Sequence, residues 1–228
     1  MLHLFKNLLR AKSKKGVRQM FLSNGRFLDH MVDIINRNTI GIIGCFRGDY
    51  LRQVHVREMA RELGSSHVTL LPHLAKLEIE KILVPKTIGR SKVYGLNLSN
   101  PECRDFISLS EKAISWNLLR KEIFIRKVFE QLANLPSVCL ILFGSYASGI
   151  NTDESDIDLL LIGKFPEVER KKLKALGETY RKEVHLTTMS QDDFMSKSAL
   201  VKEIIKNHVI LANHDIFVEL VWRQFNGG

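Results

Sequence analysis

The sequence contains few cysteines, and they are not spaced like a metal site or a disulfide framework. Cys45, Cys103 and Cys139 lie far apart, and their odd number leaves one thiol without a partner. We therefore expect buried free thiols in a reducing compartment, and a cytoplasmic protein. Long apolar runs are also missing, because no stretch approaches the roughly eighteen residues of a membrane span. These absences exclude a disulfide-stapled scaffold and a transmembrane helix.

Acidic residues are scarce in the first hundred positions. Residues 1–100 hold 17 lysines and arginines against 7 aspartates and glutamates, whereas residues 101–228 hold 17 against 18. The net charge of +9 therefore comes from the N-terminal half. This asymmetry predicts that the N-terminal half meets a polyanion, unless its basic side chains form only a solvated surface.

The first 27 residues are a basic amphipathic segment. Leu2, Phe5, Leu8 and Leu9 recur at helical spacing, and the segment 1–27 contains no acidic residue. It lacks the continuous apolar core and the cleavage site of a secretory signal. We expect a surface helix that docks on the body of the protein, in preference to a membrane anchor.

Residues 28–100 show patterns for two helices followed by a hairpin. The first helix is predicted by apolar residues at helical spacing, namely Val56, Met59, Ala60 and Leu63. Gly64 would end this helix, and either Ser65 or Ser66 would cap the next one. The run KILVPKTIGRSKVYGLN then predicts two short strands around a basic turn.

This order resembles the winged helix-turn-helix family of DNA-binding modules, over roughly residues 28–98. The resemblance implies a recognition helix at about Ser66–Leu77, a wing at Lys86–Lys92, duplex DNA as the partner, and a homodimer that reads two half-sites. It implies phosphate contacts by Arg57, Lys76, Arg90 and Lys92, and base-edge contacts by His67, Thr69 and His73. Leu71 and Pro72 depart from the polar reading surface of that family, so a protein-docking or dimerisation role stays open.

Residues 101–135 carry apolar side chains at helical spacing without a glycine. This pattern predicts a helical bridge, either one long helix or two joined helices, between the N-terminal and C-terminal halves.

The stretch ILFGSYASGINTDESDIDLLLI, residues 141–162, places a Gly-Ser turn and two aspartates between apolar strands. Because glycine permits close backbone approach and helix-start N–H groups attract phosphate, Gly144 and Ser145 are candidates to bind a nucleotide. Asp156 and Asp158 stand two residues apart, so a strand turns both carboxylates to the same face. Their repulsion would be offset by Mg²⁺ carried with the phosphates of a nucleoside triphosphate.

This spacing is similar to the signature of the DNA polymerase β-like nucleotidyltransferases, especially their minimal branch. The resemblance covers residues 116–228 and implies, with the domain itself at residues 136–228, a mixed sheet flanked by helices, Mg²⁺ on Asp156 and Asp158, and ATP as the expected nucleotide. The family usually has a third carboxylate on a later strand, and the matching strand here is expected at residues 182–190. Here His185 stands in its place, and Glu183 lies two residues earlier on the same face. Glu183 could reach the metal ion, His185 could serve as a neutral base for the proton of the acceptor, or the site could bind nucleotide without turnover.

The sequence therefore predicts an α+β protein: an N-terminal winged helix-turn-helix, a helical bridge and a C-terminal nucleotidyltransferase domain. The leading hypothesis is Mg²⁺-dependent transfer of a nucleotidyl group to a protein, an RNA or a small molecule. The alternative is a transcriptional regulator whose degenerate transferase domain senses nucleotide. Lys202 and Lys206, near the end of the chain, are either phosphate contacts or solvated helix lysines.

Overall fold

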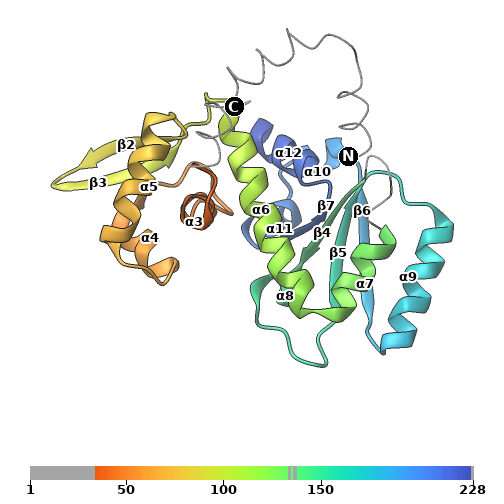
Figure 1. Ribbon diagram of the computed structural model, residues 1–228. Helices are drawn as coiled ribbons and strands as arrows, with labels where there is room; N and C mark the ends of the chain where they lie inside the picture. Colours follow the sequence, from red (N-terminus) through yellow and green to blue (C-terminus); the bar gives the residue numbers. More distant parts are fainter. Residues whose placement is uncertain (1–33, 133–134, 136–137, 227–228) are drawn as a thin grey trace, which may run out of the picture. The chain divides into compact units, whose positions relative to one another are not determined.

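The computed structural model describes residues 34–132, 135 and 138–226 (Figure 1). The chain divides into two units, Met1–Arg37 and Asn38–Gly228, and both β-sheets belong to the second. The basic amphipathic segment predicted at residues 1–27 lies outside the described residues. The fold is α+β, as the sequence predicts, with a mixed sheet flanked by helices in the C-terminal half.

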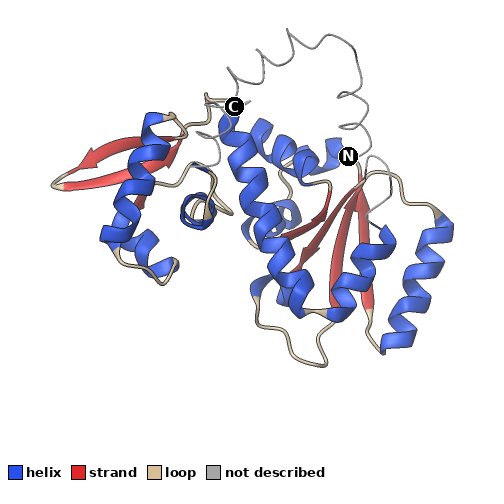
Figure 2. Ribbon diagram, viewed as in Figure 1, coloured by secondary structure: helices blue, strands red, loops and turns tan. Residues whose placement is uncertain are grey.

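The N-terminal sheet follows two helices that meet at a tight turn. Its elements are α3 (Arg37–Gly44), β1 (Val54–His55), α4 (Val56–Glu62), α5 (His67–Ile79), β2 (Leu83–Ile88) and β3 (Ser91–Leu96). Ser66, and not Ser65, caps α5, because its side chain accepts a hydrogen bond from Thr69 N at 3.1 Å. Strands β2 and β3 form the predicted hairpin, and β1 adds a third antiparallel strand in the order β1-β3-β2 (Figure 2).

Two joined helices connect the N-terminal sheet to the C-terminal sheet. The sequence left open one long helix or two joined helices, and the structure has two. They are α6 (Glu102–Lys121) and α7 (Ile123–Leu132). Glu122 lies between them in an extended conformation, with φ −101° and ψ 99°. The chain therefore changes direction at this residue.

The C-terminal sheet has the strand order β6-β5-β4-β7. The elements of this half are β4 (Cys139–Phe143), α8 (Gly144–Ser148), β5 (Ile157–Ile162), α9 (Glu167–Tyr180), β6 (Val184–Met189), α10 (Gln191–Met195), α11 (Ala199–Lys206), β7 (Val209–Ala212) and α12 (His214–Asn226). Strands β5 and β6 are parallel, joined through α9, while β4 is antiparallel to both β5 and β7. A parallel pair needs such a crossover helix, whereas antiparallel neighbours do not.

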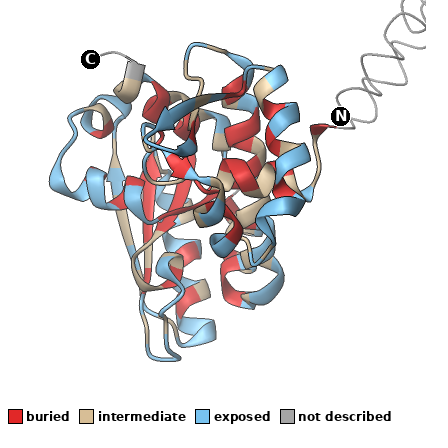
Figure 3. Ribbon diagram, turned by 90° about the vertical axis from the view of Figure 1, so that its left-hand side faces the viewer, coloured by how far each residue is buried: buried red, intermediate tan, exposed pale blue. Residues whose placement is uncertain are grey.

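Both faces of this sheet are covered by helices, which explains the continuous apolar runs in its strands. On one face, Phe124, Ile125 and Val128 of α7 and Leu173 of α9 belong to the same buried cluster as Leu140 of β4. Helix α12 lies on the other face (Figure 1). Buried residues accordingly gather in the strands and on the inner sides of the helices (Figure 3). Within the described ranges, no helix combines the length and the apolar character needed to cross a membrane.

The strand register brings three chain segments to one edge of the sheet. In the antiparallel pair β4–β5, Phe143 lies opposite Asp158. In the parallel pair β5–β6, Asp158 lies opposite His185. The Gly-Ser turn that follows β4 and the starts of β5 and β6 therefore share that edge.

Candidate active site

Gly144 brings the backbone of the Gly-Ser turn directly against the carboxylate of Asp158. A Cβ atom added at Gly144 would lie 2.2 Å from Asp158 Oδ2, and Gly144 has φ +70°, a conformation that side chains disfavour. Only glycine fits here without displacement of the carboxylate. The turn then continues into the short helix α8, in which Ser145 is half-buried.

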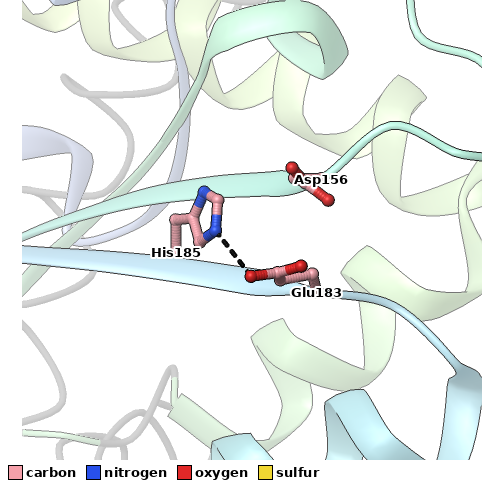
Figure 4. A group of neighbouring side chains, drawn as sticks. All are labelled: Asp156, Glu183 and His185. Atoms are coloured by element: carbon pink, nitrogen blue, oxygen red, sulfur yellow. Dashed lines mark hydrogen bonds and ion pairs between the residues drawn. The ribbon is translucent and has the colours of Figure 1, made fainter.

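Three further ligand groups gather beside this turn. Asp156 immediately precedes β5, Glu183 immediately precedes β6, and His185 is the second residue of β6. Their nearest ligand atoms all lie within 4.8 Å of one another, and all three side chains are exposed (Figure 4). His185 Nε2 lies 3.0 Å from Glu183 Oε1. On its other side, His185 Nδ1 lies 3.6 Å from Asp158 Oδ1.

The charges at this cluster are unbalanced. The hydrogen bond that His185 donates to Glu183, together with the charges of Glu183, Asp156 and Asp158, raises the pKa of His185. Three carboxylates thus surround a single imidazole. The arrangement therefore favours a positive charge at this position, either a proton on His185 or a metal ion.

The donor set fits a divalent metal ion. Carboxylate oxygens suit Mg²⁺ and Ca²⁺, whereas an imidazole nitrogen also suits Mn²⁺ and other transition ions. Asp156, Glu183 and His185 can each offer one ligand atom, and Asp158 stands next to them. The exposure of the cluster leaves room for substrate oxygens in the remaining coordination positions.

Lys182 holds the loop between α8 and β5 near this cluster. Its ammonium group donates a hydrogen bond to Asp153 O at 2.5 Å and lies 5.7 Å from the centre of the Tyr146 ring. This positioning role is not visible in the sequence, where Lys182 is one of many lysines. The only available signal is its place directly before Glu183, at the start of a predicted strand.

The residues proposed for DNA contacts do not form a single group. Arg57, His67 and Lys92 line one groove of about 750 Å³ between α4, α5 and the hairpin. His73 is instead half-buried, with Nε2 2.8 Å from Asn38 Nδ2. Lys92 is bound to Glu78 at 2.8 Å. The other proposed contacts are exposed: Thr69 and Lys76 on α5, and Arg90 in the hairpin turn.

Comparison with known proteins points to the same part of the chain. Residues 125–212 match the family model described as nucleotidyltransferase domain. These residues include the Gly-Ser turn, both aspartates, Glu183 and His185. The C-terminal half is therefore similar to nucleotidyltransferases.

One solved structure, described as the crystal structure of a toxin–antitoxin with AMP-PNP, resembles part of the chain. The similarity covers 46% of this chain and 85% of that one, at 19% identity and a TM-score of 0.31. No curated protein matches the chain.

Proposed function

We propose that the protein is a metal-dependent nucleotidyltransferase that moves a nucleotidyl group from a nucleoside triphosphate to an acceptor. The observation that carries this proposal is the meeting of Asp156, Glu183 and His185 within 4.8 Å, beside an Asp158 carboxylate that touches the Gly144 backbone. A phosphate-binding turn and a set of metal ligands at one sheet edge are the two parts that such a reaction needs.

Each residue would have a defined part in the reaction. Asp156, with Glu183 and His185, would hold the ion, and Asp158 would add negative charge beside it. When bound, the ion would offset charge on the phosphate oxygens. The backbone at Gly144 and Ser145 would hold the triphosphate. The acceptor oxygen would form a bond to the α-phosphorus as the bond to the bridging oxygen breaks and pyrophosphate leaves. Glu183 would take the proton of the acceptor through its second carboxylate oxygen, or His185 would take it if that residue is not a ligand of the ion.

His185 stands where the family usually has a carboxylate, and this difference should change which metal ion the site prefers. Because imidazole suits transition ions, we expect Mn²⁺ to support nucleotide binding and transfer better than Mg²⁺ in the wild-type protein. His185→Asp should reverse this order in favour of Mg²⁺. Equal use of both ions by both proteins would show that His185 is not a ligand.

Asp156→Ala tests the metal site directly. Titration of metal-bound ATP should show a loss of affinity of at least about 10- to 100-fold, the effect known for residues that support metal ligands. Glu154→Ala is the matched control, because Glu154 is an exposed acid of the same loop. Undiminished binding by Asp156→Ala would reject this placement of the metal.

The acceptor is identified by transfer of label from α-labelled ATP to a protein, an RNA or a small molecule.

The presence of His185 in place of the usual carboxylate favours a second function. If the wild-type protein binds metal-bound ATP tightly but transfers no label, the domain senses nucleotide, and the protein is a regulator whose DNA binding responds to it.

We further propose that residues 28–100 form a winged helix that binds duplex DNA, as a homodimer on two half-sites. Support comes from the order of α4, α5 and hairpin β2–β3, and from the basic groove that Arg57 and Lys92 share. The excess of basic residues in the first hundred positions fits a polyanionic partner. Sedimentation of the protein with and without duplex DNA tests the dimer.

A further inference from the structure

A second cavity lies apart from the carboxylate and histidine cluster. Its volume is about 890 Å³, and it is bordered by the loop that follows α3, by α11 and by the end of α12. Five of its lining side chains are cationic and one is acidic. The cations are Arg47, Arg52, Lys197, Lys202 and Lys206, and the acid is Asp49. The cavity therefore carries a strong positive charge.

Acidic neighbours neutralise only part of this charge. Arg52 is paired with Glu58 and Glu62, at 2.9 and 3.1 Å. In contrast, Lys202 and Lys206 are exposed, stand one helical turn apart on α11, and form no ion pair with any acid in the described part of the chain. These two ammonium groups are thus available to an anionic ligand.

The walls of the cavity are held together by close contacts. Gly48 has φ +83°, and a Cβ atom there would lie 2.9 Å from Lys206 O, so the loop after α3 packs tightly on the last turn of α11. Arg47 Nε is bound to Glu111 Oε2 at 3.1 Å. Arg47 Nη2 is buried without a hydrogen-bond partner among the described residues. The cavity is therefore preformed.

Part of the lining is apolar. Leu51, Ile205 and Phe225 contribute to it, and the Phe225 ring lies 5.6 Å from that of Tyr50, centre to centre. A flat ring could pack on this patch while an attached phosphate reaches the lysines. The size also fits, because small-molecule sites usually measure roughly 300–1,000 Å³.

We propose that this cavity binds a phosphate-bearing small molecule of nucleotide size, without a metal ion. The ligand would contact Lys202 and Lys206 through phosphate and the Phe225 patch through its ring. The protein's own segment 1–27 is a poor occupant, because it has seven basic and no acidic residues. Since the walls come from both the N-terminal and C-terminal halves, the ligand would favour the conformation in which these halves are in contact.

Calorimetric titration of ATP in the presence of EDTA tests this proposal, because the other site requires a metal ion. We expect about one ATP per chain. Lys202→Gln combined with Lys206→Gln should weaken binding about tenfold or more, since each removes a charge-assisted hydrogen bond. The matched control is Lys121→Gln with Lys171→Gln, which changes two exposed helix lysines outside the cavity lining and should leave the affinity unchanged.

A double variant of the proposed active site, Asp156→Ala with Asp158→Ala, should bind ATP in EDTA as the wild type does. This measurement distinguishes binding in the cavity from binding at the proposed active site, so either proposal can fail without the other. Absence of binding at millimolar ATP, or equal affinity in the lysine variant, would overturn the cavity assignment. If short duplex DNA binds through Lys202 and Lys206 and ATP does not, the surface contacts nucleic acid instead, and the small-molecule proposal is wrong.

Discussion

Gly144 combines a backbone conformation that favours glycine with a close approach to the Asp158 carboxylate. Gly144→Ala would place a methyl group 2.2 Å from Asp158 Oδ2, so either the carboxylate or the turn must move. We expect metal-dependent ATP binding to weaken at least about tenfold, because the reacting groups in such sites tolerate only small displacements. Calorimetry with metal-bound ATP measures this loss.

Gly149→Ala is the matched control for that substitution. Gly149 has the same φ of +70°, but a Cβ atom there would meet nothing within 4 Å. Both substitutions should cost about 1 kcal/mol in the free energy of unfolding, since an alanine in this conformation is strained. Only Gly144→Ala should also lose ATP binding. An equal loss in both variants would show that backbone strain, and not contact with Asp158, is responsible.

His214 should make stability depend on pH. Burial, and then the charge of Lys112, lowers its pKa to about 4, and its Nε2 lies 2.9 Å from Ser115 Oγ. The unfolded chain takes up this proton near pH 6.5 but the folded chain only near pH 4, so stability is lost as pH falls through this window. From pH 7 to pH 5 this amounts to about 2 kcal/mol.

Guanidinium denaturation of the wild type and of His214→Gln, each at pH 7 and pH 5, measures that contribution. Glutamine cannot take up the proton, so the variant should lose about 2 kcal/mol less than the wild type between the two pH values. Equal losses would mean that His214 is not kept neutral by its surroundings.

At the level of single residues, the sequence predicts those candidate site residues that stand at a regular spacing beside an apolar strand. Asp156 and Asp158 stand two residues apart at the start of one predicted strand. Glu183 and His185 have the same spacing at the start of the next predicted strand. Which of these side chains touch depends on the pairing of strands β5 and β6, which are distant in the sequence. The role of Lys182 depends on the path of a loop, and no local pattern encodes it.

Among the helices and strands, those with strong local signals match their prediction. The strand expected at residues 182–190 is β6, Val184–Met189, and the second N-terminal helix is α5, His67–Ile79. Helix α5 continues through Pro72, where a main-chain hydrogen bond is lost at a cost of about 3 kcal/mol. Burial of Leu70, Leu74 and Leu77 on its inner face offsets that cost.

The hairpin β2–β3 is the element that tests DNA binding. Arg90 in its turn is exposed, whereas Lys92 is already bound to Glu78 and lies 5.1 Å from the Tyr94 ring. For Arg90→Ala with Lys92→Ala, we expect weaker binding to duplex DNA, and a salt dependence reduced by about one unit for each lost phosphate contact. Gel shifts at several salt concentrations measure both quantities.

Because Lys92 must leave Glu78 to reach a phosphate, Arg90→Ala alone should account for most of the effect. Lys164→Ala with Lys171→Ala removes the same charge from exposed positions of the C-terminal half and serves as the control. If the control variant lowers affinity and salt dependence as much as the hairpin variant, binding reflects net charge alone, and the wing has no specific role.

At the scale of the whole molecule, one buried carboxylate joins segments that are far apart in the sequence. Glu111 of α6 accepts a hydrogen bond from Arg47 Nε at 3.1 Å, and its other oxygen lies 3.3 Å from His208 Nε2. His208 in turn donates from Nδ1 to the last carbonyls of α11, 2.9 Å from Ile205 O. Burial alone would raise the pKa of Glu111, but the charges of His208 and Arg47 outweigh it and lower the pKa.

Glu111→Ala should therefore destabilise the protein by about 3–5 kcal/mol, the usual cost of leaving a buried charge without its partner. Glu178→Ala, which removes an exposed acid of α9, should change stability by less than about 0.5 kcal/mol. Guanidinium denaturation followed by circular dichroism gives both values.

Removal of the partner as well distinguishes an unpaired charge from a simple loss of packing. Arg47→Met with Glu111→Leu replaces the pair by apolar side chains of similar size, and such replacements are often neutral. We expect this double variant to recover most of the stability that Glu111→Ala loses. If it remains as unstable as Glu111→Ala, the contribution of Glu111 comes from His208 and not from Arg47. The loop after α3 would then be held to the C-terminal half mainly by the contact of Gly48 with the end of α11.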